Sequence, residues 1–355
     1  MHRNVYSSLK FFHHPDRMEA LAAGRHLGPL HVRIKPTNVC NHDCYFCAYR
    51  SDGLSLGSTM QVRDRIPQAK MKEIVEDLIA IGTKAVTFSG GGEPLLYPHL
   101  AESAERLAGA GIGIGVLTNG SQLRGRLAQT LARTASWVRV SIDGWDSASY
   151  ARNRNVPLHS FERVLENMAA FSKMDGDCTL GASVIVDSGN AEHLFDLAQR
   201  LKSAGAEHVK LSPCIVSESA AGNAAHHRQF ANVVRSEIAR CQTLAASDFA
   251  VVDHYHFEPD PADEMRHPHC PMTRLLTVIG ADCSVYTCQD KAYTDAGRIG
   301  TIQDRRFSDL WLDDSTVSWL DNFDARTCTH HCVAATKNRL LNDFIDVDRS
   351  HVAFV

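Results

Sequence analysis

The stretch Pro36-Thr37-Asn38-Val39-Cys40-Asn41-His42-Asp43-Cys44-Tyr45-Phe46-Cys47 decides the interpretation of this chain. It places three cysteines at the spacing C-x3-C-x2-C, directly after an alternating segment over 31–35 that predicts a β-strand. Three thiolates on one short loop can hold three irons of a [4Fe–4S] cluster and leave the fourth iron open. The alternative is a zinc site with His42 as fourth ligand, although structural zinc sites usually use C-x2-C pairs.

The next predicted strand, over 85–88, ends in a second unusual sequence, Ser89-Gly90-Gly91-Gly92-Glu93-Pro94. Glycines at a strand end let the backbone come close to a ligand. The carboxylate of Glu93 can accept a hydrogen bond from an ammonium group. A glycine run alone indicates only a turn, but a glycine run after strand two beside a cysteine triad after strand one favours an iron–sulfur site over zinc.

Strand-like and helix-like segments alternate from about residue 30 to residue 215. The range 70–81, for example, has apolar residues at helical spacing with charges on the other face. Six such strand–helix units predict a parallel sheet, curled into an incomplete barrel. In that fold the functional residues lie at the carboxyl ends of the strands. Residues 218–247 are predicted to be helical, whereas 265–340 show little periodicity, as expected where metal organises the chain.

The chain has 355 residues, a net charge of −4 and eleven cysteines, an odd number that excludes full disulfide pairing within the chain. Three cysteines fall in 40–47 and five in 270–332, which predicts two metal or redox sites. The N-terminus lacks the apolar region of a secretory signal, and no apolar run is long enough to span a membrane. We therefore expect a cytoplasmic protein with reduced thiols, and neither a membrane nor a nucleic acid as partner.

These motifs resemble the radical S-adenosylmethionine (radical SAM) superfamily. The resemblance covers most of 31–215 and rests on four sequences at strand ends: the cysteine triad, Gly91-Gly92-Glu93-Pro94, Thr118-Asn119-Gly120 and Ser141-Ile142-Asp143-Gly144. It implies an α/β fold with a partial (β/α)6 TIM-like barrel. It also implies that SAM chelates the open iron of a cluster held by Cys40, Cys44 and Cys47. One electron then cleaves SAM to a 5′-deoxyadenosyl radical, which abstracts a hydrogen atom from the substrate.

The same resemblance implies roles for residues around SAM. Phe46 is expected to lie against the adenine, and Gly91 to Glu93 are expected to contact the methionine end. Ser141 and Asp143 are expected to contact the ribose or the substrate. Gly90 and Asn119 complete the predicted cofactor-binding set. Core packing for Phe46 and strand capping for Ser141 and Asp143 remain as alternatives at this point.

The C-terminal cysteines resemble the SPASM/twitch extension that some radical SAM enzymes carry. The resemblance rests on Asp282–Cys288, on Gly300-Thr301-Ile302 and on Phe307–Trp311. Five cysteines are too few for the two-cluster form, so one auxiliary [4Fe–4S] cluster is expected. The predicted ligands are Cys270, Cys288, Cys328 and Cys332. In the alternative set Cys283, which occupies a position where the family commonly has glycine, replaces Cys328; a third alternative leaves one iron free for substrate.

The predicted organisation has an N-terminal extension over 1–29, the partial barrel over 30–215, a connecting region over 216–264 and the auxiliary domain over 265–345. The expected substrate is a small polar molecule (a sugar, nucleotide sugar or aminocyclitol) that is dehydrogenated, epimerised or rearranged. Only about 30 residues precede the first strand and the cysteines are few, so peptide modification is the second hypothesis. Tetrapyrrole side-chain chemistry and a non-enzymatic iron–sulfur or zinc redox sensor are minor alternatives.

Two further expectations complete the prediction. Cys214 follows the sixth strand and faces the barrel opening, where a thiol can donate a hydrogen atom to a substrate radical, as an epimerase requires; the alternative is a buried bystander. The reductive step implies an electron-donor protein such as a flavodoxin or ferredoxin.

Overall fold

The structure is a computed structural model that describes residues 6–51, 53–257, 268–328, 332–348 and 350–354. One sheet organises it, with the strand order β10-β9-β8-β1-β2-β3-β4-β5-β6-β7. The strands are β1 (His31–Ile34), β2 (Ala85–Phe88), β3 (Gly113–Thr118), β4 (Trp137–Ser141), β5 (Thr179–Val186), β6 (His208–Pro213), β7 (Ala250–Asp253), β8 (Leu276–Ile279), β9 (Ser284–Tyr286) and β10 (Arg298–Thr301).

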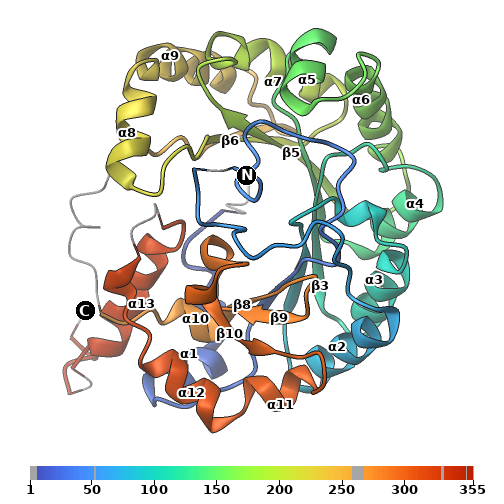
Figure 1. Ribbon diagram of the computed structural model, residues 1–355. Helices are drawn as coiled ribbons and strands as arrows, with labels where there is room; N and C mark the ends of the chain where they lie inside the picture. Colours follow the sequence, from blue (N-terminus) through green and yellow to red (C-terminus); the bar gives the residue numbers. More distant parts are fainter. Residues whose placement is uncertain (1–5, 52, 258–267, 329–331, 349, 355) are drawn as a thin grey trace.

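The described helices are α1 (Pro15–Ala22), α2 (Gln68–Ala80), α3 (Leu100–Gly109), α4 (Gly125–Thr134), α5 (Ser147–Arg154), α6 (Ser160–Phe171), α7 (Leu194–Ser203), α8 (Ala220–Arg228), α9 (Ala231–Gln242), α10 (Met272–Leu275), α11 (Phe307–Trp311), α12 (Asp314–Asp321) and α13 (Ala335–Asp346). Of these, α2, α3, α4, α6 and α7 lie outside the curled sheet and cover its outer face (Figure 1). None of the helices in the described ranges is long and apolar enough to cross a membrane.

The strands alternate between a dry face and a partly exposed face. Val32, Ile34, Val138 and Val140 point toward the helices and are 0% exposed, whereas the residues between them are partly exposed. The period of two therefore separates an apolar core under the helices from an inner face that carries polar and charged side chains.

The six predicted strands of the barrel are present as β1 to β6, and all their pairings are parallel. The α/β prediction is thus confirmed, and the predicted helical region 218–247 contains α8 and α9. The sheet is longer than predicted, because β7 pairs parallel with β6 and β8 pairs parallel with β1. The residues of β7 are all at least partly exposed, and β8 lies in the range 265–340, where the sequence shows little periodicity.

The C-terminal segment contains more regular structure than its weak periodicity predicts. Strand β8 joins it to the barrel sheet, and β9 and β10 continue as an antiparallel extension. The helices α10 to α13 lie beside this extension (Figure 1). Strand β8 belongs to the predicted auxiliary domain over 265–345, yet it pairs with β1 of the barrel in one continuous sheet. The division of the chain into domains therefore stays a prediction.

Candidate active site

The loop with Cys40, Cys44 and Cys47 leaves the carboxyl end of β1. A turn between Cys47 N and Cys44 O (3.1 Å) brings two of the cysteines together. The end of α5 holds the loop, because the backbone nitrogens of Asp43 and Tyr45 donate to carbonyl oxygens of α5 at 3.0 and 3.2 Å. All three thiols are free and partly buried.

These thiols lie in each other's electrostatic field. Burial raises the pKa of Cys44 to about 12, and the charges of Asp143, Cys47 and Cys40 act in the same direction. Burial likewise raises the pKa of Cys40, with Glu93 and Cys47 adding to it. The Arg154 guanidinium acts against these effects at Cys44 and lowers its pKa. A metal centre supplies a further positive partner that favours the thiolate form of Cys40 and Cys44.

Gly91 and Gly92 allow the end of β2 to lie directly against the cysteine loop. A Cβ at Gly91 would come within 2.5 Å of the Asn38 side chain, and one at Gly92 within 2.2 Å of the Val39 carbonyl oxygen. Gly92 N donates to Thr37 O at 3.2 Å in the same contact. The glycines are thus required for the approach of two strand ends, in addition to any contact with a ligand.

Glu93 is 2% exposed, and hydrogen bonds from the chain engage both of its carboxylate oxygens. One accepts from Leu95 N at 3.0 Å and Thr118 Oγ1 at 2.6 Å, and the other from Asn119 N at 2.7 Å. The Asn119 side chain in turn donates to Asn41 Oδ1 at 2.9 Å. Glu93 therefore joins the ends of β2 and β3 and, through Asn119, the cysteine loop.

Asp143 and Ser141, at the end of β4, surround the guanidinium of Arg154. Arg154 donates from Nε to Asp143 Oδ1 at 2.7 Å and from Nη2 to Ser141 Oγ at 3.1 Å. Asn153 donates to the second oxygen of Asp143 at 3.2 Å, and Asp143 is 1% exposed. The guanidinium also lies 5.4 Å from the ring centroid of Phe46. Arg154 thus links the cysteine loop to the strand end.

The predicted Cys214 lies directly after β6 and is 2% exposed. Its carbonyl oxygen is hydrogen-bonded to His227 Nε2 at 2.8 Å. Burial raises the pKa of the Cys214 thiol to about 12, and the charges of Asp187 and Asp143 act in the same direction. The side chain therefore stays a neutral thiol.

Sequence reasoning missed a cluster next to Cys214. Tyr45, between the second and third cysteines, donates to Asp187 Oδ2 at 3.0 Å, and His226 Nε2 lies 2.6 Å from Asp187 Oδ1. Asp187 directly follows β5, so the rule that functional groups lie at strand carboxyl ends was a signal for it. Nothing in the sequence connected it with Tyr45 or His226.

The C-terminal cysteines Cys270, Cys288, Cys328 and Cys332 influence each other. The pKa of Cys270 is raised to about 11 by burial, and the charge of Cys328 acts in the same direction. The pKa of Cys332 is raised to about 12 by burial, with Asp290, Cys270 and Cys328 adding to it. Burial also raises the pKa of Cys288, and the charges of Cys270 and Cys332 contribute.

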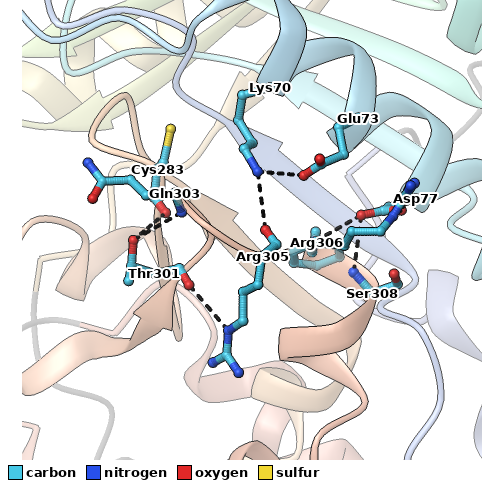
Figure 2. A network of polar contacts seen from close by, with 10 residues as sticks. Lys70, Glu73, Asp77, Cys283, Thr301, Gln303, Arg305, Arg306 and Ser308 are labelled. Atoms are coloured by element: carbon cyan, nitrogen blue, oxygen red, sulfur yellow. Dashed lines mark hydrogen bonds and ion pairs between the residues drawn. The ribbon is translucent and has the colours of Figure 1, made fainter.

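Cys283 has different neighbours. It lies in the left-handed backbone region at φ 58° and is 5% exposed. Figure 2 shows its surroundings: Thr301 donates to the Cys283 carbonyl at 3.3 Å, and Lys70 extends from α2 toward the same segment. The charges that act on this thiol are those of Asp282, Lys70, Asp64 and Glu73, none of them a cysteine.

A short polar bridge connects the two cysteine groups. The ammonium of Lys35, 0% exposed, donates to Tyr49 Oη at 2.7 Å and to Gln289 Oε1 at 3.2 Å. Tyr49 lies two residues after Cys47, and Gln289 directly follows Cys288. The two groups are therefore neighbours across the inner face of the sheet.

Comparison with known proteins identifies the region that carries this loop. Residues 34–201 match the model of the Radical SAM superfamily. This part of the chain is similar to a radical SAM domain. The matched range starts at the last residue of β1 and ends in α7, so it includes the cysteine loop and the ends of β1 to β5.

Two curated relatives share part of this radical SAM domain. One is the dTDP-4-amino-4,6-dideoxy-D-glucose ammonia-lyase of Streptomyces venezuelae, 28% identical over 194 residues, which are 50% of this chain and 37% of that protein. The other is the AdoMet-dependent heme synthase of Methanosarcina barkeri (strain Fusaro / DSM 804), 29% identical over 174 residues, which are 48% of this chain and 47% of that protein. The chain thus spans less than half the length of these relatives.

A solved structure extends the likeness beyond the domain. Streptococcus suis SuiB bound to the precursor peptide SuiA superposes with a TM-score of 0.61 and 18% identity, over 91% of this chain and 75% of that one. The same protein has also been solved with S-adenosylmethionine bound. At this identity the likeness shows the fold alone.

Radical SAM proteins bind a [4Fe–4S] cluster and SAM, and the donors of this loop fit that cluster. Three free thiols lie on one loop beside two glycines that admit no side chain. Within the described residues no group of three or more His, Cys, Asp or Glu side chains is arranged as a metal site. The fit therefore rests on the type, number and placement of the donors.

Proposed function

We propose that the chain is a radical SAM enzyme that abstracts a hydrogen atom from a small polar substrate. The observation that supports this most strongly is the loop of Cys40, Cys44 and Cys47, fixed to the glycine-rich end of β2 inside the matched domain. A redox sensor without an enzymatic role would need neither the glycine-rich strand end nor three ligands that leave one iron open.

In this proposal Cys40, Cys44 and Cys47 hold a [4Fe–4S] cluster. When bound, this cluster supplies the electron that cleaves SAM to a 5′-deoxyadenosyl radical. The backbone of Gly90 to Gly92 borders the methionine end, and Glu93 orients the Asn119 backbone from its buried position. Phe46 packs against the adenine.

Ser141 and Asp143 act mainly by holding Arg154, which keeps the loop and Phe46 in place. This arrangement favours the capping alternative for both residues. Any contact with the ribose or the substrate is made by atoms of Ser141 and Asp143 that Arg154 leaves free. A rigid, water-poor surround protects a reactive radical from side reactions.

The C-terminal thiols Cys270, Cys288, Cys328 and Cys332 are proposed to hold one auxiliary [4Fe–4S] cluster. Their mutual electrostatic influence supports this set, and the separate surroundings of Cys283 argue against the alternative that includes it. Such a cluster takes up or relays an electron, which a net dehydrogenation requires. A flavodoxin or ferredoxin is the proposed reductant.

The proposed substrate is a sugar, nucleotide sugar or aminocyclitol, and the outcome is dehydrogenation, epimerisation or rearrangement. The relative named for a nucleotide-sugar ammonia-lyase supports this class. For epimerisation the thiol of Cys214 is the proposed hydrogen donor, since its raised pKa keeps the S–H bond at neutral pH. Peptide modification is the second candidate, favoured by the likeness to SuiB.

The test is to reduce the anaerobically reconstituted chain with dithionite in the presence of SAM and measure 5′-deoxyadenosine by mass spectrometry. Formation of 5′-deoxyadenosine is expected, and its absence in a preparation with intact iron would contradict the proposal. Deuterated nucleotide sugars then test the substrate class, because abstraction transfers deuterium into 5′-deoxyadenosine. Transfer from a peptide instead would support the second candidate.

A further inference from the structure

Three cationic side chains lie on the inner face of the sheet, each on a different strand. They are Arg33 on β1, Arg139 on β4 and Lys210 on β6. Each alternates with 0%-exposed apolar residues that face the helices, and each is itself partly exposed. The three cations therefore lie on the face of the sheet opposite the dry, helix-facing one, where they are only partly buried.

Lys337 on α13 brings a fourth positive charge to the same place. The charges of Arg139, Arg33 and Lys337 all act on Lys210, and together with burial they lower its pKa to about 8. Lys10 and Arg33 act in the same way on Lys337, although the Cys332 charge opposes them. Charges from four elements are thus close enough to repel each other.

These four cations, Arg33, Arg139, Lys210 and Lys337, have no acidic ion-pair partner among the described residues. The buried Nε atoms of Arg33 and Arg139 have no hydrogen-bond partner. Arg33 donates from Nη1 to Gln289 Oε1 at 3.3 Å. The Arg139 guanidinium lies 4.9 Å from the Trp137 ring centroid and 5.4 Å from that of Tyr6.

Burying unpaired cations together costs free energy through desolvation and repulsion. Aromatic faces recover only part of that cost, and they leave the N–H groups in the guanidinium plane unbonded. A multiply charged anion would neutralise the charges and accept hydrogen bonds from the orphaned Nε atoms. One carboxylate brings only one negative charge against four positive ones, whereas a diphosphate brings two or three.

We infer that the inner face of the sheet binds the diphosphate of the substrate through Arg33, Arg139, Lys210 and Lys337. The substrate of the proposed reaction is then a diphosphate-linked small molecule of the nucleotide-sugar class. This inference rests on the proposed function for the identity of the site, and it narrows the substrates considered there.

The position of the cations fits a substrate that reaches the cysteine loop. Arg33 lies two residues before Lys35, whose ammonium contacts Tyr49 in the loop segment. Arg139 and Lys210 likewise lie two residues before Ser141 and Ser212. Two residues of strand are about 7 Å. A diphosphate bound at the cations therefore leaves the group attached to it beside the strand ends.

Calorimetric titration of the reconstituted chain with inorganic pyrophosphate tests the inference. Pyrophosphate should bind, and Arg139→Gln or Lys210→Gln should weaken binding at least tenfold. The control Arg200→Gln removes an exposed arginine on α7, 3.8 Å from Glu162, and should leave binding unchanged. Propane-1,2,3-tricarboxylate serves as the carboxylate probe and should bind more weakly than pyrophosphate.

Several results would overturn the inference: no pyrophosphate binding by the wild-type chain, equal binding by the variants and the wild type, or tighter binding of the tricarboxylate. The wild-type comparison of the two anions holds even where a variant fails to fold. Measuring 5′-deoxyadenosine on the same wild-type preparation separates the two proposals. Cleavage of SAM without pyrophosphate binding contradicts the diphosphate site alone, and binding without cleavage contradicts the proposed function alone.

Discussion

The two cysteine groups of this chain are assembled in different ways. Cys40, Cys44 and Cys47 lie within eight consecutive residues, and hydrogen bonds with the end of α5 and the segment after β2 hold their loop. The C-terminal group takes its cysteines from 270, 288 and 328–332, and it is brought to the barrel by β8. The first is a local site, and the spacing of its cysteines in the sequence is enough to predict it. The second, here called the gathered site, forms only when the whole C-terminal segment packs.

The largest expected effect comes from breaking the local site. In Cys44→Ala the loop keeps two thiols, too few to hold a cluster with one open iron. We expect 5′-deoxyadenosine formation to fall below detection and iron to drop by about four atoms per chain. Cys178→Ala, directly before β5 and outside both cysteine groups, is the matched control and should keep both. Unchanged SAM cleavage in Cys44→Ala would contradict the assignment of the loop.

The gathered site is tested by its ligand set. Cys288→Ala should lower the iron content by about four atoms per chain, because the auxiliary cluster loses one of four thiols that, unlike the loop triad, come from separate segments. Cys283→Ala should keep its iron, since no cysteine lies among the charges that act on this thiol. Iron analysis with Mössbauer spectroscopy measures both. Iron loss in Cys283→Ala would restore the alternative ligand set.

The support of the local loop is tested at Arg154. Removing its guanidinium in Arg154→Met leaves the carboxylate of Asp143 buried and without its charge partner. Breaking a buried ion pair on one side costs about 3–5 kcal/mol, which denaturant unfolding detects. Arg152→Gln, two residues away and exposed, is the control and should unfold like the wild type. The double variant Arg154→Met/Asp143→Asn should recover part of the loss.

The smallest effect is expected at the contact that attaches the C-terminal segment to the barrel. Asp77 on α2 is 1% exposed, and it accepts hydrogen bonds from Phe307 N at 2.8 Å and from Arg306 (Figure 2). Asp77→Asn removes the charge at the start of α11 and should lower the free energy of unfolding by about 1–2 kcal/mol. Glu76→Gln, whose partner Arg106 is exposed, should show no measurable change. Equal behaviour of the two variants would contradict this role of Asp77.

The features that could be predicted from the sequence are those that depend on residues close together in the chain. The six parallel strands, the placement of the cysteine loop after β1 and the glycine-rich end of β2 all follow from short-range patterns. The pairing of β8 with β1 was missed, because it joins segments about 240 residues apart and leaves no period in the sequence.

The contacts of the charged side chains in the site could not be predicted from the sequence either. Glu93 was expected to meet an ammonium, but its oxygens are engaged by Thr118, Asn119 and Leu95. The pairing of Asp143 with Arg154 follows from the position of α5 above β4, and only the folded chain specifies it. The contact of His226 with Asp187 was likewise not predicted.

The most direct test of the central claim is the fate of SAM with the wild-type chain. The anaerobically reconstituted protein, reduced with dithionite, is incubated with SAM, and 5′-deoxyadenosine and methionine are quantified together. The proposal predicts that both products form in equal amounts, and only while the thiols of the Cys40–Cys47 loop are intact. Intact SAM after prolonged incubation of a fully iron-loaded chain would contradict it.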